Sequence, residues 1–143
     1  MEIKVELLKP YTDEQKIKFI VENNHKKGYT IEETETSLIA LGMTEEEKQA
    51  QEQQRIAMLS LTAADVERGI YKATGKDFED VVAMVTELQP IGLDIKALKI
   101  ELKANNFYRG NIYVDKVGEL LGFSKKQLDL FFETNDYTKL ISQ

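Results

Sequence analysis

The segment from Thr44 to Arg55 limits what this chain can fold into more than any other feature of the sequence. It reads TEEEKQAQEQQR, a run of strong helix formers whose only apolar residue is Ala50. A helix of this composition has almost no face to bury against a core. We therefore expect an exposed connector helix here, with a separate part of the chain on each side of it.

The two parts differ in their apolar patterning. Alternation and Thr-rich, β-branched stretches precede the connector, whereas helical periodicity follows it. With 143 residues, of which 42% are hydrophobic, the chain can supply one domain of about 80 residues and a small appendage. The sequence predicts an α+β, mostly α protein with a small N-terminal β-α-β-β module (residues 1–43), a polar connector helix (residues 44–60) and a compact all-α domain of four to five short helices (residues 61–143). We expect a frayed tail after Glu133.

The N-terminal module is predicted from local signals. Residues Ile3–Leu7 alternate apolar and charged side chains, and Ser37–Leu41 is short and apolar, so both are expected to be strands. Between them, Thr12 to Gln15 form a capping box that opens a helix with an apolar stripe of Ile17, Ile20 and Val21. The two strands leave edges that little sequence remains to cover, so we expect a homo-oligomer.

Charge argues against several kinds of partner. The chain carries 25 acidic and 19 basic residues, a formal net charge of -6 and a sequence pI near 4.9. This field repels phosphate backbones and anionic lipid, so neither nucleic acid nor a membrane is the expected partner. The first residues, MEIKVELLKP, do not resemble a secretory signal, and no apolar run approaches the roughly 20 residues that span a bilayer. We expect a cytoplasmic protein.

No group of residues predicts catalysis, a cofactor or a metal. The chain has no cysteine and a single histidine, His25, which cannot by itself build a typical zinc site or a nucleophile–base pair. Paired carboxylates such as Glu32 and Glu33 lie in solvated or capping contexts, and glycine-rich phosphate loops are absent. We expect a protein that is not an enzyme.

The segment Gly118–Phe132 has the outline of a helix-turn-helix. A glycine-containing turn is followed by a candidate N-cap, Ser124, and by a second helix that starts with Lys125 and Lys126. In a DNA-binding regulator, these lysines would contact phosphates and Gln127 a base edge. A corner between two packed helices has the same sequence pattern, and the acidic residues nearby favour that structural interpretation.

A second candidate surface surrounds a turn. Tyr108 and Arg109 are residue types that protein interfaces favour, and with Asn111 they could form a polar recognition patch. The structural alternative is that Phe107 or Tyr108 fills the core while Arg109 caps backbone carbonyl groups.

Read end to end, the chain resembles a group of small uncharacterised prophage and phage proteins encoded in the late region near tail-fibre or baseplate genes. The similar stretches are Tyr11–Gln15, Phe19–His25, Thr44–Glu47 with the Gln/Glu-rich helix, Leu61–Thr62, Tyr108–Asn111 and Leu120–Phe123. The resemblance implies a non-enzymatic phage structural or tail-morphogenesis protein that contacts tail or baseplate components, in the cytoplasm of the bacterial host or in the virion. It implies no site residue. The alternative function is a DNA-binding regulator that uses Gly118–Phe132.

Overall fold

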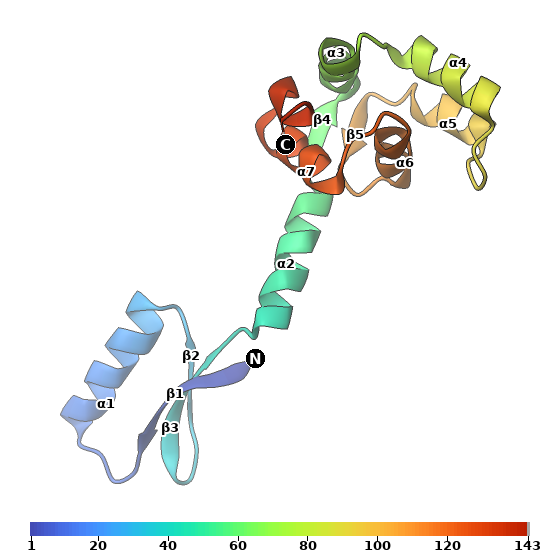
Figure 1. Cartoon of the computed structure of the whole chain (residues 1–143). Helices are drawn as coiled ribbons and strands as arrows, with labels where there is room; N and C mark the ends of the chain where they lie inside the picture. The colour runs from blue at the N-terminus through green and yellow to red at the C-terminus, as the bar shows by residue number, and fades with distance from the viewer. Residues whose placement is uncertain (143) are drawn as a thin grey trace. The chain divides into compact units, whose positions relative to one another are not determined.

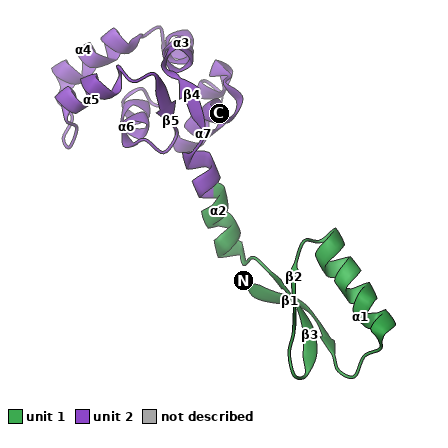
Figure 2. Ribbon diagram, turned by 180° about the vertical axis from the view of Figure 1, so that it is seen from behind, with its two compact units in different colours: residues 1–52 green, residues 53–143 purple. Residues whose placement is uncertain are grey.

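The computed structural model describes residues 1–142 and is α+β, mostly helical (Figure 1). Its elements fall into two units, residues 1–52 and residues 53–143 (Figure 2). The division lies inside α2 (Glu45–Ala57), in the segment expected to connect the two parts. No side chain of α2 is buried, which confirms the expectation of an exposed helix.

The N-terminal unit is a β-α-β-β module, as the sequence predicts. It contains β1 (Glu2–Leu8), α1 (Asp13–Ile20), a π-helical segment η1 (Val21–Lys26), β2 (Thr30–Glu33) and β3 (Ser37–Gly42). The strands form an antiparallel sheet in the order β1-β3-β2. The expectation that Ser37–Leu41 forms an edge is therefore wrong, because β3 pairs with β2 on one side and with β1 on the other.

The helix of this unit buries only part of the expected stripe, because Ile20 packs against the core whereas Val21 is 37% exposed. Its capping box of Thr12 and Gln15 is present, but Ile17 is 63% exposed and Phe19 enters the core with Leu38 and Ala40. Residues two apart cannot share one helical face, and the larger aromatic side chain takes the buried position. Along η1 the buried side continues through Asn23, whose Nδ2 donates to the Phe19 carbonyl oxygen at 2.9 Å.

The C-terminal unit contains five α-helices and two short strands within the described residues. In order, these are β4 (Ser60–Thr62), α3 (Ala63–Thr74), α4 (Phe78–Leu88), α5 (Ile95–Glu101), β5 (Asn106–Tyr108), α6 (Ile112–Leu120) and α7 (Lys125–Thr134), followed by a 3-10 helix, η2 (Tyr137–Leu140). The number of helices agrees with the expectation.

Two features of this unit correct the expectation of an all-α domain with a frayed end. The strands β4 and β5 pair antiparallel with Leu61 opposite Phe107, and three residues per strand are too few to give a period in the sequence. The chain after Glu133 is not frayed, because η2 packs on the unit and Leu140 is only 2% exposed.

The core of the C-terminal unit forms around two neighbouring apolar clusters. One includes Val66, Ile70, Phe107, Leu128, Phe131, Phe132 and Leu140, and the other includes Val81, Val85, Leu98 and Val117. Leu102 and Leu121 pack against both, so the clusters are continuous. Close helix packing depends on Gly69, since a Cβ atom there would lie 2.3 Å from the Phe131 ring.

Candidate interaction surfaces

The structure separates the three residues of the expected patch on the turn after β5. Tyr108 is 53% exposed, whereas Arg109 is only 6% exposed. Asn111 caps α6 by accepting a hydrogen bond from the Tyr113 amide at 2.9 Å, and its Nδ2 donates to Glu101 at 3.0 Å. Of these three residues, only Tyr108 is exposed to solvent.

Arg109 holds three elements together, so its assignment to a surface patch is corrected. Its Nε donates to Asp129 at 2.7 Å and its Nη1 donates to Asp115 at 2.9 Å. Its Nη2 donates to the backbone carbonyl oxygen of Lys125 at 3.3 Å. A buried guanidinium needs charged and polar partners. The carbonyl contact matches the structural alternative, while the two aspartates were not identified from the sequence because they lie on α6 and α7.

The expected helix-turn-helix outline is present as α6, the turn at Leu121–Ser124, and α7. Lys125 and Lys126 are exposed at the start of α7. The amide of Gln127 is occupied at both ends: Oε1 accepts from the Ser124 amide at 2.8 Å and Nε2 donates to the Ser142 carbonyl at 2.8 Å. Gln127 therefore supports the helix cap and the C-terminal segment, and only one N–H and one lone pair of its side-chain amide remain for a further contact.

The two faces of the N-terminal sheet differ. Cross-strand partners lie on one face, so Val5, Ala40 and Ile31 form a row beneath α1, next to the pair Leu7 and Leu38. The opposite face carries the row Ile3–Leu41–Thr30, the row Glu6–Ile39–Glu32 and the pair Leu8–Ser37. Ile3 is 54% and Leu8 is 64% exposed. We call Ile3, Glu6, Leu8, Glu32, Ile39 and Leu41 the open sheet face.

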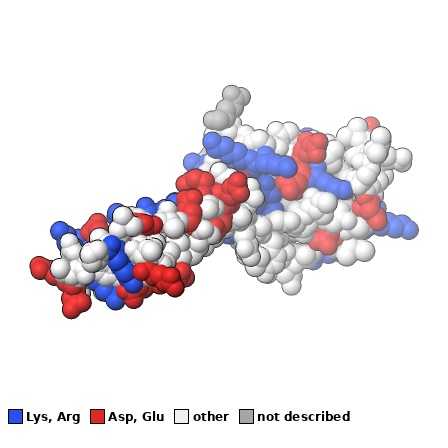
Figure 3. All heavy atoms as spheres, turned by 90° about the horizontal axis from the view of Figure 1, so that it is seen from below, with Lys and Arg blue, Asp and Glu red and all other residues white. Residues whose placement is uncertain are grey.

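Ionic contacts surround this sheet. The Tyr11 hydroxyl donates to Glu33, and Lys9 and Lys16 each lie 3.7 Å from the same carboxylate. The hydrogen bond to Glu33 raises the pKa of Tyr11 to about 12, and the same bond, followed by the two lysines, lowers the pKa of Glu33. In the view of Figure 3, acidic and basic side chains are interleaved over this unit.

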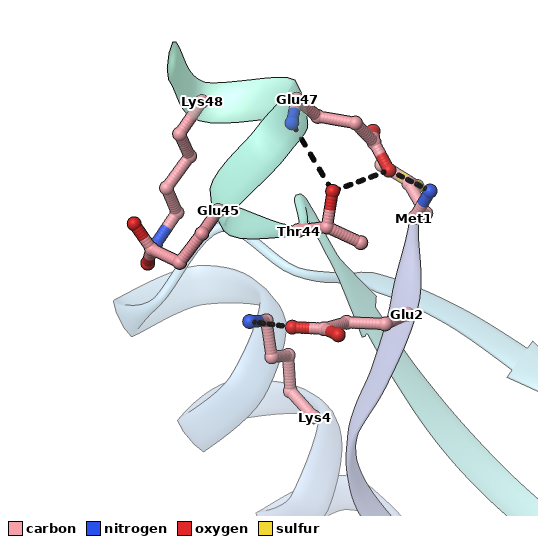
Figure 4. Close-up of polar contacts among 7 residues, drawn as sticks. All are labelled: Met1, Glu2, Lys4, Thr44, Glu45, Glu47 and Lys48. Atoms are coloured by element: carbon pink, nitrogen blue, oxygen red, sulfur yellow. Dashed lines mark hydrogen bonds and ion pairs between the residues drawn. The ribbon is translucent and has the colours of Figure 1, made fainter.

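A further polar cluster joins β1 to the start of α2 (Figure 4). Thr44 accepts from the Glu47 amide at 3.1 Å, and the Glu47 carboxylate pairs with the Met1 ammonium group. This ammonium group is the main reason that the pKa of Glu47 is lowered. Nearby, Lys4 pairs with Glu2 and Lys48 with Glu45. The cluster is composed of exposed ion pairs, and its role is to stabilise the N-terminal unit.

Residues 1–142 contain neither a cluster of metal ligands nor a helix that could span a membrane. No group of three or more metal-ligating side chains lies together in this range, and none of its helices has the length and apolar character needed to cross a bilayer. Comparison with protein-family models, curated proteins and solved structures finds no match for the chain.

Proposed function

We propose that this protein is a non-enzymatic phage structural or tail-morphogenesis protein that acts through protein–protein contacts. The observation that supports this most is the open sheet face of the N-terminal unit. Ile3 and Leu8 are more than half exposed there, Leu41 is partly exposed, and Ile39 between the strand ladders is only 8% exposed. Exposed apolar side chains on one sheet face with charged residues between them are typical of surfaces that bind another protein.

The charge around this face defines the chemistry of the partner. Glu6 and Glu32 flank Ile39 across the two strand ladders, and residues 1–52 contain 12 acidic residues, 7 lysines and no arginine. Like charges on a second copy of the unit would repel. The complementary partner presents apolar side chains between basic ones.

The side-chain face is a better candidate than the strand edges. The two edge strands of the sheet are β1 and β2. Strand β1 is interrupted by a register shift between Ile3 and Val5, with Lys4 at the irregularity. Bulges and edge lysines oppose the addition of another strand. We therefore propose contact through side chains of the open sheet face, with a tail or baseplate component in keeping with the sequence resemblance.

Site-specific photo-crosslinking in cells that produce the full chain tests this proposal. A crosslinker replaces Leu8 on the open sheet face, and the matched control replaces Lys18, an exposed residue of α1 on the other side of the sheet. We expect a discrete protein adduct from position 8 that is weak or missing from position 18. Reversing the rim with Glu6→Lys and Glu32→Lys should reduce its yield at least tenfold.

The identity of the adduct decides between the two parts of the proposal. A phage tail or baseplate protein supports both. A partner unrelated to phage assembly would overturn the tail assignment, and equal labelling from positions 8 and 18 would overturn the open sheet face as a binding surface.

A further inference from the structure

The loop between α4 and α5 presents Ile91 entirely to solvent. Its side chain is 105% exposed, the highest value among the large apolar residues that are exposed in residues 1–142, and Leu88 at the end of α4 is 61% exposed. An isoleucine in this position gains nothing from the fold of its own chain. Its burial by another molecule would remove a full apolar side chain from water.

The loop that carries Ile91 is held at several points. Gln89 ends α4 with φ 44°, and its backbone N–H donates to the Val85 carbonyl oxygen at 2.9 Å. Gly92 adopts φ 81° within the turn. Lys116 on α6 donates to the Gly92 carbonyl at 2.6 Å. Asp94 then caps α5 by accepting from the Ala97 amide at 3.1 Å. A side chain on such a fastened loop loses little conformational freedom on binding.

A hollow lies directly beside this side chain. It is lined by Pro90, Ile91, Leu93, Lys116, Glu119 and Leu120 and has a volume of about 240 Å³. This exceeds the roughly 150 Å³ in which an apolar protein cavity can hold a benzene molecule. The surface therefore combines a protruding aliphatic side chain with an adjacent space large enough to receive one.

The charges on the rim of the hollow are also self-complementary. Lys116 and Glu119 lie one turn apart on α6, and Glu119 forms no ion pair with any of residues 1–142. If two copies met about a two-fold axis, Lys116 of each could face Glu119 of the other. A two-fold interface requires such reciprocity, because the same patch is used on both sides.

We propose that the C-terminal unit binds a second copy of this chain through this surface, with Ile91 of each copy inserted into the hollow of the other. This goes beyond the proposed function, because the open sheet face belongs to the N-terminal unit. The paired contacts are the Ile91 side chains in the two hollows and the two Lys116–Glu119 ion pairs across the axis.

Analytical ultracentrifugation of the full chain tests the proposal. We expect the chain to be dimeric when its concentration is raised to roughly 200 µM, because this concentration exceeds the micromolar dissociation constants of weak interfaces. Ile91→Asp should raise the dimer dissociation constant at least about 30-fold, as expected for a central anchor. Because Ile91 is fully exposed in the single chain, the melting temperatures of the Ile91→Asp chain and the unaltered chain should agree at concentrations low enough for both to be monomeric. The matched control is Ile17→Asp on α1, another exposed isoleucine, which should leave the dimer intact.

A charge exchange distinguishes the two-fold arrangement from other associations. Lys116→Glu and Glu119→Lys should each be monomeric alone, because each places like charges opposite one another. Mixed in equal amounts, the two variants should form a heterodimer. A monomeric wild-type chain, a dimer insensitive to Ile91→Asp, or a failure of the mixture to associate would overturn the proposal.

Discussion

In the N-terminal unit most lysines pair with glutamates at the surface, whereas in the C-terminal unit many acidic side chains hold backbone and helices in place. The surface pairs include Lys9 and Lys16 with Glu33, and Lys26 and Lys27 with Glu22. In the C-terminal unit, Asp77, Asp94 and Asp136 cap helices, and Asp115 and Asp129 bind Arg109. Charged side chains therefore lie mainly in surface ion pairs in the N-terminal unit, whereas in the C-terminal unit several of them cap helices or bind a buried arginine.

The largest expected effect is at Arg109. Arg109→Met should lower the free energy of unfolding of the C-terminal unit by about 2–4 kcal/mol, because it leaves Asp115 and Asp129 without their shared partner. The loss lies at the lower end for a buried pair since these carboxylates are 37% and 35% exposed and can regain water. Urea denaturation followed by far-UV circular dichroism measures it.

The matched control is Arg68→Met. Arg68 pairs with Asp65 at 3.0 Å, but its side chain is 60% exposed. An exposed pair of this kind contributes less than about 1 kcal/mol. Equal losses at Arg109 and Arg68 would show that charge contacts in the C-terminal unit are as dispensable as surface pairs.

Helix packing in the C-terminal unit should give the next largest effect. Gly69→Ala places a Cβ atom 2.3 Å from Phe131 Cζ, so that ring or α3 must move. Overpacking of this size costs about 1–3 kcal/mol, and the better helix propensity of alanine offsets up to about 1 kcal/mol of it. In a Phe131→Leu background the substitution should cost much less, which a double-mutant cycle measures. Additive effects would argue against the contact.

In the N-terminal unit the expected effects depend on pH. The folded state lowers the pKa of Glu33. This carboxylate therefore stabilises the unit at pH values above the pKa of an unfolded glutamate, about 4.3, and its contribution is lost as the pH falls through the pKa of the folded state. The folded state raises the pKa of Tyr11 to about 12. The stabilisation from this hydroxyl is therefore present at pH values below the pKa of an unfolded tyrosine, about 10, and is lost as the pH rises through the pKa of the folded state.

The substitution Tyr11→Phe separates this hydrogen bond from its surroundings. NMR titration of Glu33 should show its pKa moving toward the ordinary glutamate value, with the remaining depression caused by Lys16 and Lys9. An unchanged Glu33 titration would mean that the lysines, and not the tyrosine, control this carboxylate.

The smallest effects are expected at the start of α7. Lys125 and Lys126 are exposed, so Lys125→Ala with Lys126→Ala should change stability by no more than about 0.5 kcal/mol. The unaltered chain should show only weak, non-specific retention on DNA near physiological salt, because its net charge of -6 opposes approach. Sequence-selective, nanomolar binding that the double substitution weakens would instead support the regulator.

Features that depend on neighbouring residues were predictable from the sequence. The capping residues Thr12, Asp77 and Ser124 each accept from an amide three residues later, so type and spacing were sufficient. Arg109 was not predictable in this way. Its partners lie 6 to 20 residues away, and only the folding of α6 and α7 brings them to it.

The candidate binding surfaces were only partly predictable for the same reason. Alternation showed that Ile3 and Val5 belong to a strand, but an irregularity between them changes which side chains share a face. In the C-terminal unit, a proline and a glycine such as Pro90 and Gly92 are typical of a helix end and carry no information on the exposure of the residue between them. That the intervening Ile91 is left in solvent depends on Lys116, 24 residues beyond Gly92.

The way in which the chain passes from α2 into the C-terminal unit has a mechanical consequence. The Gly110 amide donates to the Ala57 carbonyl at 3.0 Å, and the Arg109 amide donates to the Leu59 carbonyl at 2.7 Å, just before β4 pairs with β5. Gly110 permits this approach, since a Cβ atom there would lie 3.0 Å from that of Ala57. Tension that reaches the unit along α2 therefore loads these two bonds and the short β4–β5 ladder first, and the helical core bears it only after they rupture.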